Sequence, residues 1–203
     1  SSAASDVYKR QIQDLYNAGC RNIQLDDCTW GMMADRSGHL AYGTTAEGLK
    51  EIQKIHKDIN NQVIANAPKD LTINTHVCRG NFHSTYANSG AYDPVADILF
   101  GEENVNAYYL EFDDERSGGF APLAKVSGDK KVVLGLITTK SPKLENKEEV
   151  IARIKEAANY IPLDRLYLSP QCGFASCEIG NKLTEKEQWD KLRLVKEIAE
   201  EVW

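Results

Sequence analysis

The sequence predicts an α/β protein with a parallel sheet, built as the C-terminal portion of a (β/α)8 TIM barrel. Five β-prone segments alternate with helical segments along the 203 residues, which is typical of a parallel sheet of βα units. The fingerprint of doubly wound nucleotide-binding sheets, Gly-x-Gly-x-x-Gly after the first strand, does not occur. Reactive side chains instead follow several strands, and barrel enzymes carry their chemistry at such strand ends. These residues are Asp26, Asp27, His76, Cys78, Glu111, Lys140 and Cys172.

Composition and charge exclude two classes of partner. The net charge of −6, the pI near 5.3 and the lack of a Lys/Arg cluster argue against a nucleic-acid partner. No apolar run reaches membrane-spanning length and no signal peptide is present, so we expect a cytoplasmic protein without a membrane partner. Five cysteines, an odd number, indicate reduced thiols rather than a disulfide framework.

Residues 1–11 differ in character from the rest of the chain. Asp6-Val-Tyr-Lys-Arg-Gln11, preceded by Ser1-Ser-Ala-Ala-Ser5, resembles the translation of a transposon end used in sequencing-library preparation. We therefore interpret residues 1–11 as a non-native leader and residues 12–203 as a partial barrel domain. The alternative is a genuine polar helix start that Ser5 caps.

The first part of the chain contains two predicted strands and two predicted helices. Apolar residues from Ile12 to Tyr16 mark the end of an amphipathic helix that stops near Gly19. Residues 22–27 follow as a strand with acidic residues at its end. Helical spacing of apolar residues then predicts a helix around residues 49–59, and alternation predicts a strand at residues 71–76.

The second part contains three predicted strands and three predicted helices. Asp93 as cap and Pro94 in the first turn begin one helix, and residues 150–161 form another. The strands cover residues 106–112, 131–137 and 165–169. Thr184 and Glu187 form a capping box for the closing helix. The predicted inner face of this helix consists of Trp189, Leu192, Val195, Ile198 and Val202.

Five βα units are fewer than the eight that close a barrel. A barrel that lacks three strands leaves two open edges and an unsealed core. We therefore expect the first three units to lie upstream of residue 12, and we expect the chain alone to be inactive.

His76 and Cys78 lie two residues apart where the strand at residues 71–76 ends. Successive side chains of a strand point to opposite faces, so these two point the same way. An imidazole beside a thiolate is half of a zinc site. For this pair alone, a buried cysteine next to an ordinary histidine is the better explanation.

Glu111 and Cys172 also follow predicted strands, and each has a plain alternative. Glu111 could form an ion pair at a strand end, and Cys172 could be a small buried residue before a glycine turn. In a parallel barrel, however, all these strand ends meet over one mouth. His76, Cys78, Glu111 and Cys172 then form an N/S/O/S ligand set suited to Zn²⁺. Its carboxylate is the more exchangeable ligand, so a substrate thiolate could enter.

These residues belong to a set of motifs that resembles the catalytic C-terminal barrel of the cobalamin-independent methionine synthase family. The matching segments are Ile23-Gln-Leu-Asp26, Thr75-His-Val-Cys78 with Asn81-Phe82, the strand ending in Glu111 with Arg116-Ser117, Ser141-Pro142, Ile161-Pro-Leu-Asp-Arg-Leu166 and Ser169-Pro-Gln-Cys-Gly173. The match covers nearly all of residues 12–203. It implies that His76, Cys78, Glu111 and Cys172 bind catalytic zinc and that Asp26 binds the amino group of homocysteine. A helix-cap acid is the alternative for Asp26.

The resemblance also implies a reaction. Zinc deprotonates the homocysteine thiol, and the sulfur attacks the methyl group on N5 of 5-methyltetrahydrofolate (a polyglutamate), which yields methionine. The leaving nitrogen needs a general acid. The family's histidine at this point is replaced by Lys140, which could donate the proton from a dry site, while a solvated loop lysine is the alternative. The family's Asp-Glu-Pro is Asp26-Asp27-Cys28 here, and both departures make the chain look more like the short single-barrel relatives.

Two other interpretations remain open. One is a related zinc barrel that alkylates another thiol, as the epoxyalkane–coenzyme M transferases do. The other is a zinc-binding barrel that has a structural or regulatory role without turnover.

Overall fold

The strands of the molecule form one parallel sheet in the order β1-β2-β3-β4-β5, in a computed structural model that describes residues 2–35 and 37–203. The strands are β1 (Asn22–Asp26), β2 (Thr72–Val77), β3 (Ala107–Glu111), β4 (Lys131–Ile137) and β5 (Leu166–Pro170). Each strand pairs in parallel with the next strand along the chain. The predicted α/β class, the parallel sheet and its five strands are thus confirmed, and the described strands form an open sheet with β1 and β5 at its edges.

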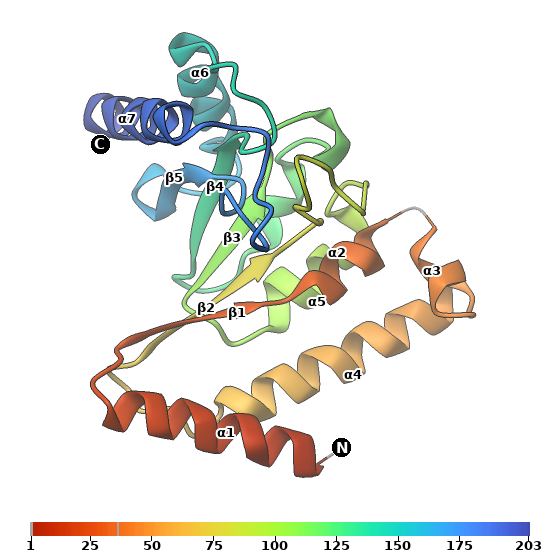
Figure 1. Ribbon diagram of the computed structural model, residues 1–203. Helices are drawn as coiled ribbons and strands as arrows, with labels where there is room; N and C mark the ends of the chain where they lie inside the picture. The colour runs from red at the N-terminus through yellow and green to blue at the C-terminus, as the bar shows by residue number, and fades with distance from the viewer. Residues whose placement is uncertain (1, 36) are drawn as a thin grey trace.

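Helices connect the strands, as the alternation predicts. They are α1 (Ser2–Asn17), α2 (Cys28–Ala34), α3 (Gly38–Ala41), α4 (Ala46–Ile64), α5 (Asp93–Glu102), α6 (Lys147–Ala157) and α7 (Glu185–Val202), with 3-10 turns η1 (Glu115–Ser117), η2 (Ala121–Lys125) and η3 (Leu163–Arg165). Figure 1 shows α6 and α7 at one end of the sheet and α1 and α4 at the other. None of the helices described is both long and apolar enough to cross a membrane.

Helices α2, α3 and α5 differ in detail from the sequence predictions. Helices α2 and α3 were not predicted, because each is too short to show a helical period. The cap of α5 is Tyr92, and Asp93 is its first helical residue. Helix α1 passes without a break across the predicted boundary between residues 11 and 12, and the non-native origin of residues 1–11 stays a prediction.

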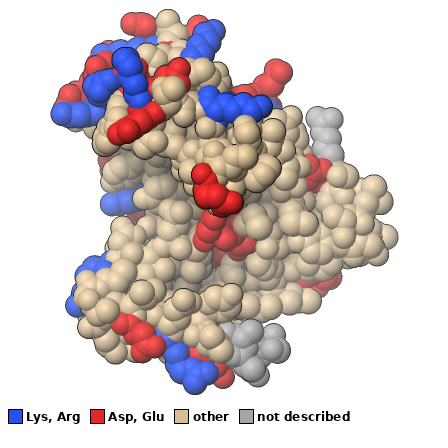
Figure 2. Space-filling model, in the orientation of Figure 1, with Lys and Arg blue, Asp and Glu red and all other residues tan. Residues whose placement is uncertain are grey.

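The inner face of α7 matches the predicted one only in part. The capping box of Thr184 and Glu187 is confirmed, Ile198 is buried, and Val195 and Val202 pack against the core as predicted. Trp189, however, is 52% exposed, and Lys191 and Leu194 are buried instead. The Lys191 ammonium is buried because it donates to both Glu145 carboxylate oxygens at 3.0 Å and to Lys143 O at 2.8 Å. Elsewhere on this end of the molecule, acidic and basic side chains lie intermixed over α6 and α7 (Figure 2).

The two faces of the sheet differ in chemistry. On the helix-covered face, alternate residues such as Ile73, Val77, Tyr108, Leu110 and Leu134 are buried in the hydrophobic core. The opposite face carries polar side chains and forms two cavities of about 530 and 440 Å³. The larger cavity lies where the strands end, which is where barrel enzymes hold their substrates.

Candidate metal centre

The four residues predicted to bind zinc come together at the carboxyl edge of the sheet. His76 lies near the end of β2 and Cys78 follows that strand directly, while Glu111 ends β3 and Cys172 lies two residues beyond β5. One ligand atom from each of the four residues lies within 4.8 Å of the others. Parallel pairing explains the convergence, because it brings all the strand ends to the same edge.

A glycine in β4 allows β5 to approach closely enough for this arrangement. Gly135 pairs with Glu111 across the sheet. A Cβ atom at Gly135 would lie 2.6 Å from Gln171 Cα and 2.7 Å from Leu110 O, which is closer than real Cβ contacts. Only glycine therefore lets the backbone before Cys172 lie against β3 and β4.

His76 is oriented for binding through Nε2. Its Nδ1 lies 3.2 Å from Tyr109 O, and because a carbonyl oxygen can only accept, Nδ1 carries the proton. Nε2 is buried and has no hydrogen-bond partner among the described residues. Burial alone would lower the pKa of His76, but the neighbouring Cys78 sulfur and the Asp26 and Glu111 carboxylates raise it on balance. A buried acceptor nitrogen that faces sulfur and carboxylate ligands fits a metal site.

Glu111 is completely buried and is held by three neighbours. Its Oε1 accepts from Arg79 N at 2.7 Å, and its Oε2 accepts from Arg116 Nη2 at 2.8 Å. The Tyr92 hydroxyl accepts from Glu111 N at 3.1 Å and lies 3.3 Å from Glu111 O, to which it donates. Arg116 competes for the electron density of the carboxylate, so Glu111 would be the weaker and more exchangeable ligand of a bound metal.

The Cys78 and Cys172 thiols shift each other's pKa in opposite directions, so one loses its proton more easily than the other. Contact with Cys172, together with burial, raises the pKa of the Cys78 thiol far above its usual range. Contact with Cys78 lowers the pKa of Cys172 despite its burial. The chain alone thus favours one thiolate, and a divalent cation is what would stabilise both.

Lys140 and Asp26 each lie near one member of this cluster. The Lys140 side chain is 9% exposed, with Nζ 3.7 Å from Glu111 Oε2, so it is not a solvated loop lysine. Asp26 is 69% exposed and lines the 530 Å³ cavity, with Oδ1 3.9 Å from His76 Nε2. The helix-capping role considered for Asp26 belongs to Asp27, which accepts from Thr29 N at 3.1 Å at the start of α2.

Asp27 also anchors a partly buried polar network that the sequence did not predict. Its Oδ2 lies 2.8 Å from His56 Nε2 and accepts from Asn60 Nδ2 at 2.9 Å, and Asn60 donates to Glu103 Oε1 at 2.7 Å. Burial would raise the pKa of Asp27, but the hydrogen bonds from His56 and Asn60 lower it on balance. His56 and Asn60 lie four residues apart on α4 and share one face, which is the signal that could have identified them.

The buried carboxyl group of Glu103 should make the stability of the fold depend on pH, and glutamine at this position should remove that contribution. Burial raises the pKa of Glu103 from 4.5 to about 7, although Asn60 opposes the shift. Between these pH values the folded state binds a proton that the unfolded state lacks, so stability falls as pH rises through this window. We expect Glu103→Gln to be more stable relative to wild type at pH 8 than at pH 4.5, by roughly 3 kcal/mol. Urea unfolding at both pH values measures this, with Glu178→Gln as the matched control for loss of an exposed carboxylate.

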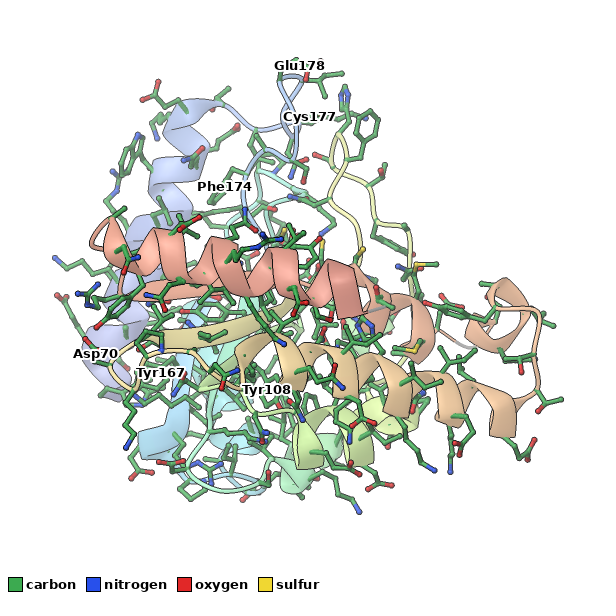
Figure 3. All side chains as sticks on the ribbon, turned by 90° about the horizontal axis from the view of Figure 1, so that it is seen from below. Asp70, Tyr108, Tyr167, Phe174, Cys177 and Glu178 are labelled. Atoms are coloured by element: carbon green, nitrogen blue, oxygen red, sulfur yellow. The ribbon has the colours of Figure 1, made fainter. Side chains whose placement is uncertain are left out.

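The remaining cysteines lie outside the cluster. Cys20, Cys28 and Cys177 are free thiols, as are the two cysteines of the cluster. Figure 3 places Cys177 and Glu178 at the tip of the loop that follows β5. Cys177 therefore offers a matched control for substitutions in the cluster.

Comparison with known proteins identifies the family. The model of the cobalamin-independent synthase catalytic domain matches residues 3–201. The uncharacterised protein YxjG of Bacillus subtilis is 50% identical over 203 residues, which are 98% of the chain and 53% of that protein. A methionine synthase of Pyrococcus horikoshii is 28% identical over 167 residues, covering 82% of the chain and 40% of that protein.

A solved structure shares the fold. It is from Listeria monocytogenes, is assigned as a vitamin-B12-independent methionine synthase, and matches with a TM-score of 0.76 at 36% identity. The match covers 98% of the chain and 54% of the Listeria chain, so the present chain spans about half the length of such relatives. The chain belongs to the cobalamin-independent methionine synthase catalytic-domain family.

Proposed function

We propose that the chain is part of a zinc-dependent methyltransferase that moves a methyl group from 5-methyltetrahydrofolate, as a polyglutamate, to the thiol of homocysteine. The observation that carries the proposal is the convergence of His76, Cys78, Glu111 and Cys172 within 4.8 Å beside the cavity that Asp26 lines. Family membership supports the reaction class. We further propose that the sheet forms the later five units of a (β/α)8 barrel, with three units supplied upstream of residue 12.

The ligand set fits zinc in both chemistry and orientation. Two sulfurs, an imidazole nitrogen and a carboxylate are ligands that Zn²⁺ accepts, and the His76 Nδ1 bond to Tyr109 O holds the ring with Nε2 toward the other three. Bound zinc would supply a Lewis acid that keeps an acceptor thiol deprotonated at neutral pH. Glu111, already shared with Arg116, is the ligand that gives way most easily to an incoming sulfur.

Asp26 and Lys140 then act on the two substrates. Asp26 projects into the cavity as an exposed carboxylate and binds the ammonium group of homocysteine, which orients its sulfur toward the cluster. The sulfur attacks the methyl carbon while the bond from that carbon to the folate nitrogen breaks, and this nitrogen takes up a proton. Lys140, buried and with no hydrogen bond to its Nζ among the described residues, is the proposed proton donor.

Methyl transfer is tested in a complete barrel. The chain is joined to the part of the Bacillus subtilis relative that it does not match, and methionine formation from homocysteine and labelled methyl-folate is measured with zinc. We expect turnover that Lys140→Met lowers without loss of zinc. A hybrid that folds and binds zinc, but methylates only another thiol or none, would overturn the proposal in favour of a coenzyme M type transferase or a non-catalytic barrel.

Asp26→Asn should weaken homocysteine binding without affecting the metal. A carboxylate that binds an ammonium ion contributes about 1.5–3 kcal/mol, so we expect the KM for homocysteine to rise roughly 10–100-fold. Zinc content should stay at the wild-type level, because Asp26 is not among the four clustered ligands. Calorimetry with homocysteine and with a thiol that lacks the amino group separates this role from a general defect, since only the first should weaken.

A further inference from the structure

We propose that Asn181 is a positioning residue that fixes three loops of the proposed metal centre relative to one another. The inference rests on the proposed zinc site, to which the three loops after β2, β4 and β5 contribute Cys78, Lys140 and Cys172. Asn181 lies in the segment between β5 and α7, outside the short sequence motifs on which the resemblance to the family rests.

The Asn181 side chain bonds to two of these loops at once. Its Nδ2 donates to Asn81 Oδ1 at 2.8 Å, in the loop after β2, and to Thr139 O at 2.9 Å, in the loop after β4. Its Oδ1 accepts from Ser84 N at 2.9 Å, again in the loop after β2. Its own backbone N donates to Phe174 O at 3.1 Å, so the loop after β5 is tied to the same point.

Further bonds in this amide cluster (Asn81, Thr139, Gln171 and Asn181) reach the neighbours of Cys172. Asn81 Nδ2 donates to Gly173 O at 2.6 Å. Gln171 Oε1 accepts from Thr139 N at 2.6 Å, and Gln171 Nε2 donates to Thr139 Oγ1 at 3.0 Å. Cys172 is therefore held on both sides, by Gln171 and by Gly173, while Thr139 directly precedes Lys140.

Burial makes the amide cluster sensitive to the loss of one member. Asn81, Thr139 and Gln171 are 4%, 0% and 1% exposed, so water cannot replace a lost partner. In the described structure each buried side-chain polar atom of the cluster has a partner, unlike those of Arg79 or Lys140. Loss of the Asn181 amide leaves Asn81 Oδ1 and Thr139 O without their best donor, and the loops can then shift relative to one another.

Asn181→Asp is the sharpest substitution, because it keeps the shape of the side chain, removes the amide donor and puts a negative charge in its place. A carboxylate would face the oxygens of Asn81 and Thr139 that now accept. We expect the Kd for Co²⁺, used as a spectroscopic substitute for zinc, to rise about 10–100-fold. The absorption from sulfur-to-cobalt charge transfer should weaken as well, because it depends on the placement of Cys78 and Cys172. Asn181→Ala repeats the test without a new charge and decides it if the aspartate variant does not fold.

Asn159→Asp is the matched control. Asn159 is exposed and lies just after α6, and among the described residues its side chain bonds only to Glu156 O, at 3.0 Å. The same chemical change there should leave both Co²⁺ affinity and spectrum at wild-type values.

A second measurement tests Asn181 without any metal. Phenylarsine oxide binds two thiols only when they lie close together, losing its oxygen as water. In a background with Cys20, Cys28 and Cys177 replaced by serine, we expect the Asn181 variants to bind it at least tenfold more weakly than the parent. Wild-type affinity of both Asn181 variants for Co²⁺ and for the arsenical would overturn the inference. A parent chain that binds no Co²⁺ would instead refute the proposed zinc site, and the arsenical would still decide the role of Asn181.

Discussion

Replacement of either Cys78 or Cys172 by serine should remove most of the zinc from the chain, which should otherwise bind one ion per molecule. The expected loss follows from the geometry, because each substitution leaves three ligands of a set that converges within 4.8 Å. A serine hydroxyl does not deprotonate as a zinc-bound thiol does. Since loss of an outer-shell partner alone costs about 10–100-fold in affinity, loss of a ligand should exceed 100-fold. Metal analysis after dialysis against a weak chelator measures the effect.

Cys177→Ser provides the matched control for this experiment. Cys177 is a free thiol at the tip of the loop after β5 (Figure 3), and the same substitution there should leave the zinc content unchanged. Equal zinc in wild type, Cys78→Ser and Cys172→Ser would show that the cluster does not hold the metal. The methyl-transfer proposal would then lose its basis.

Gly135→Ala should both destabilise the fold and disrupt the metal centre. The new Cβ would lie 2.6 Å from Gln171 Cα and 2.7 Å from Leu110 O, and both are backbone atoms that cannot rotate away. Overpacking of a rigid core costs typically about 1–3 kcal/mol, and we expect a loss at the upper end of this range. The backbone at Gln171 must move, and Cys172 moves with it, so zinc affinity should fall with stability. Urea unfolding and zinc titration measure the two effects.

Gly101→Ala is the corresponding control. Gly101 lies in α5, and a Cβ built there has no neighbouring atom within 4 Å. Alanine at this helical position should stabilise the chain by about 0.5–1 kcal/mol. Wild-type stability and zinc affinity in Gly135→Ala would show that β5 does not depend on close approach at this point.

The regular elements could be predicted because their signals are local. Alternation and apolar runs located all five strands to within one residue, and Thr184 with Glu187 located the start of α7. The predicted inner face of α7 was wrong at Trp189, because apolar spacing cannot show that Lys191 is buried by Glu145. That ion pair joins residues 46 positions apart in the chain, and no local pattern reports it.

In the candidate metal centre, only the reactive residues could be predicted from the sequence. His76, Cys78, Glu111 and Cys172 stand out by residue type and by their position after strands, and parallel pairing makes their convergence foreseeable. The residues that hold these four in place could not be recognised from the sequence. Arg79 acts through its backbone N–H, and Gly135 acts through the absence of a side chain. Asn181 resembles any loop asparagine until its partners 42 and 100 residues away are known.

The sequence by itself determined the class of fold, the order of its strands and the residue types at the carboxyl edge, since periodicity and strand ends are properties of short segments. Tertiary structure alone decided which oxygen of Glu111 meets Arg116, how Lys140 comes to be buried beside it, and which amides hold the loops. The physical reason is that hydrogen bonds and ion pairs between distant segments depend on distances of a few tenths of an ångström, which arise only when the strands are packed side by side.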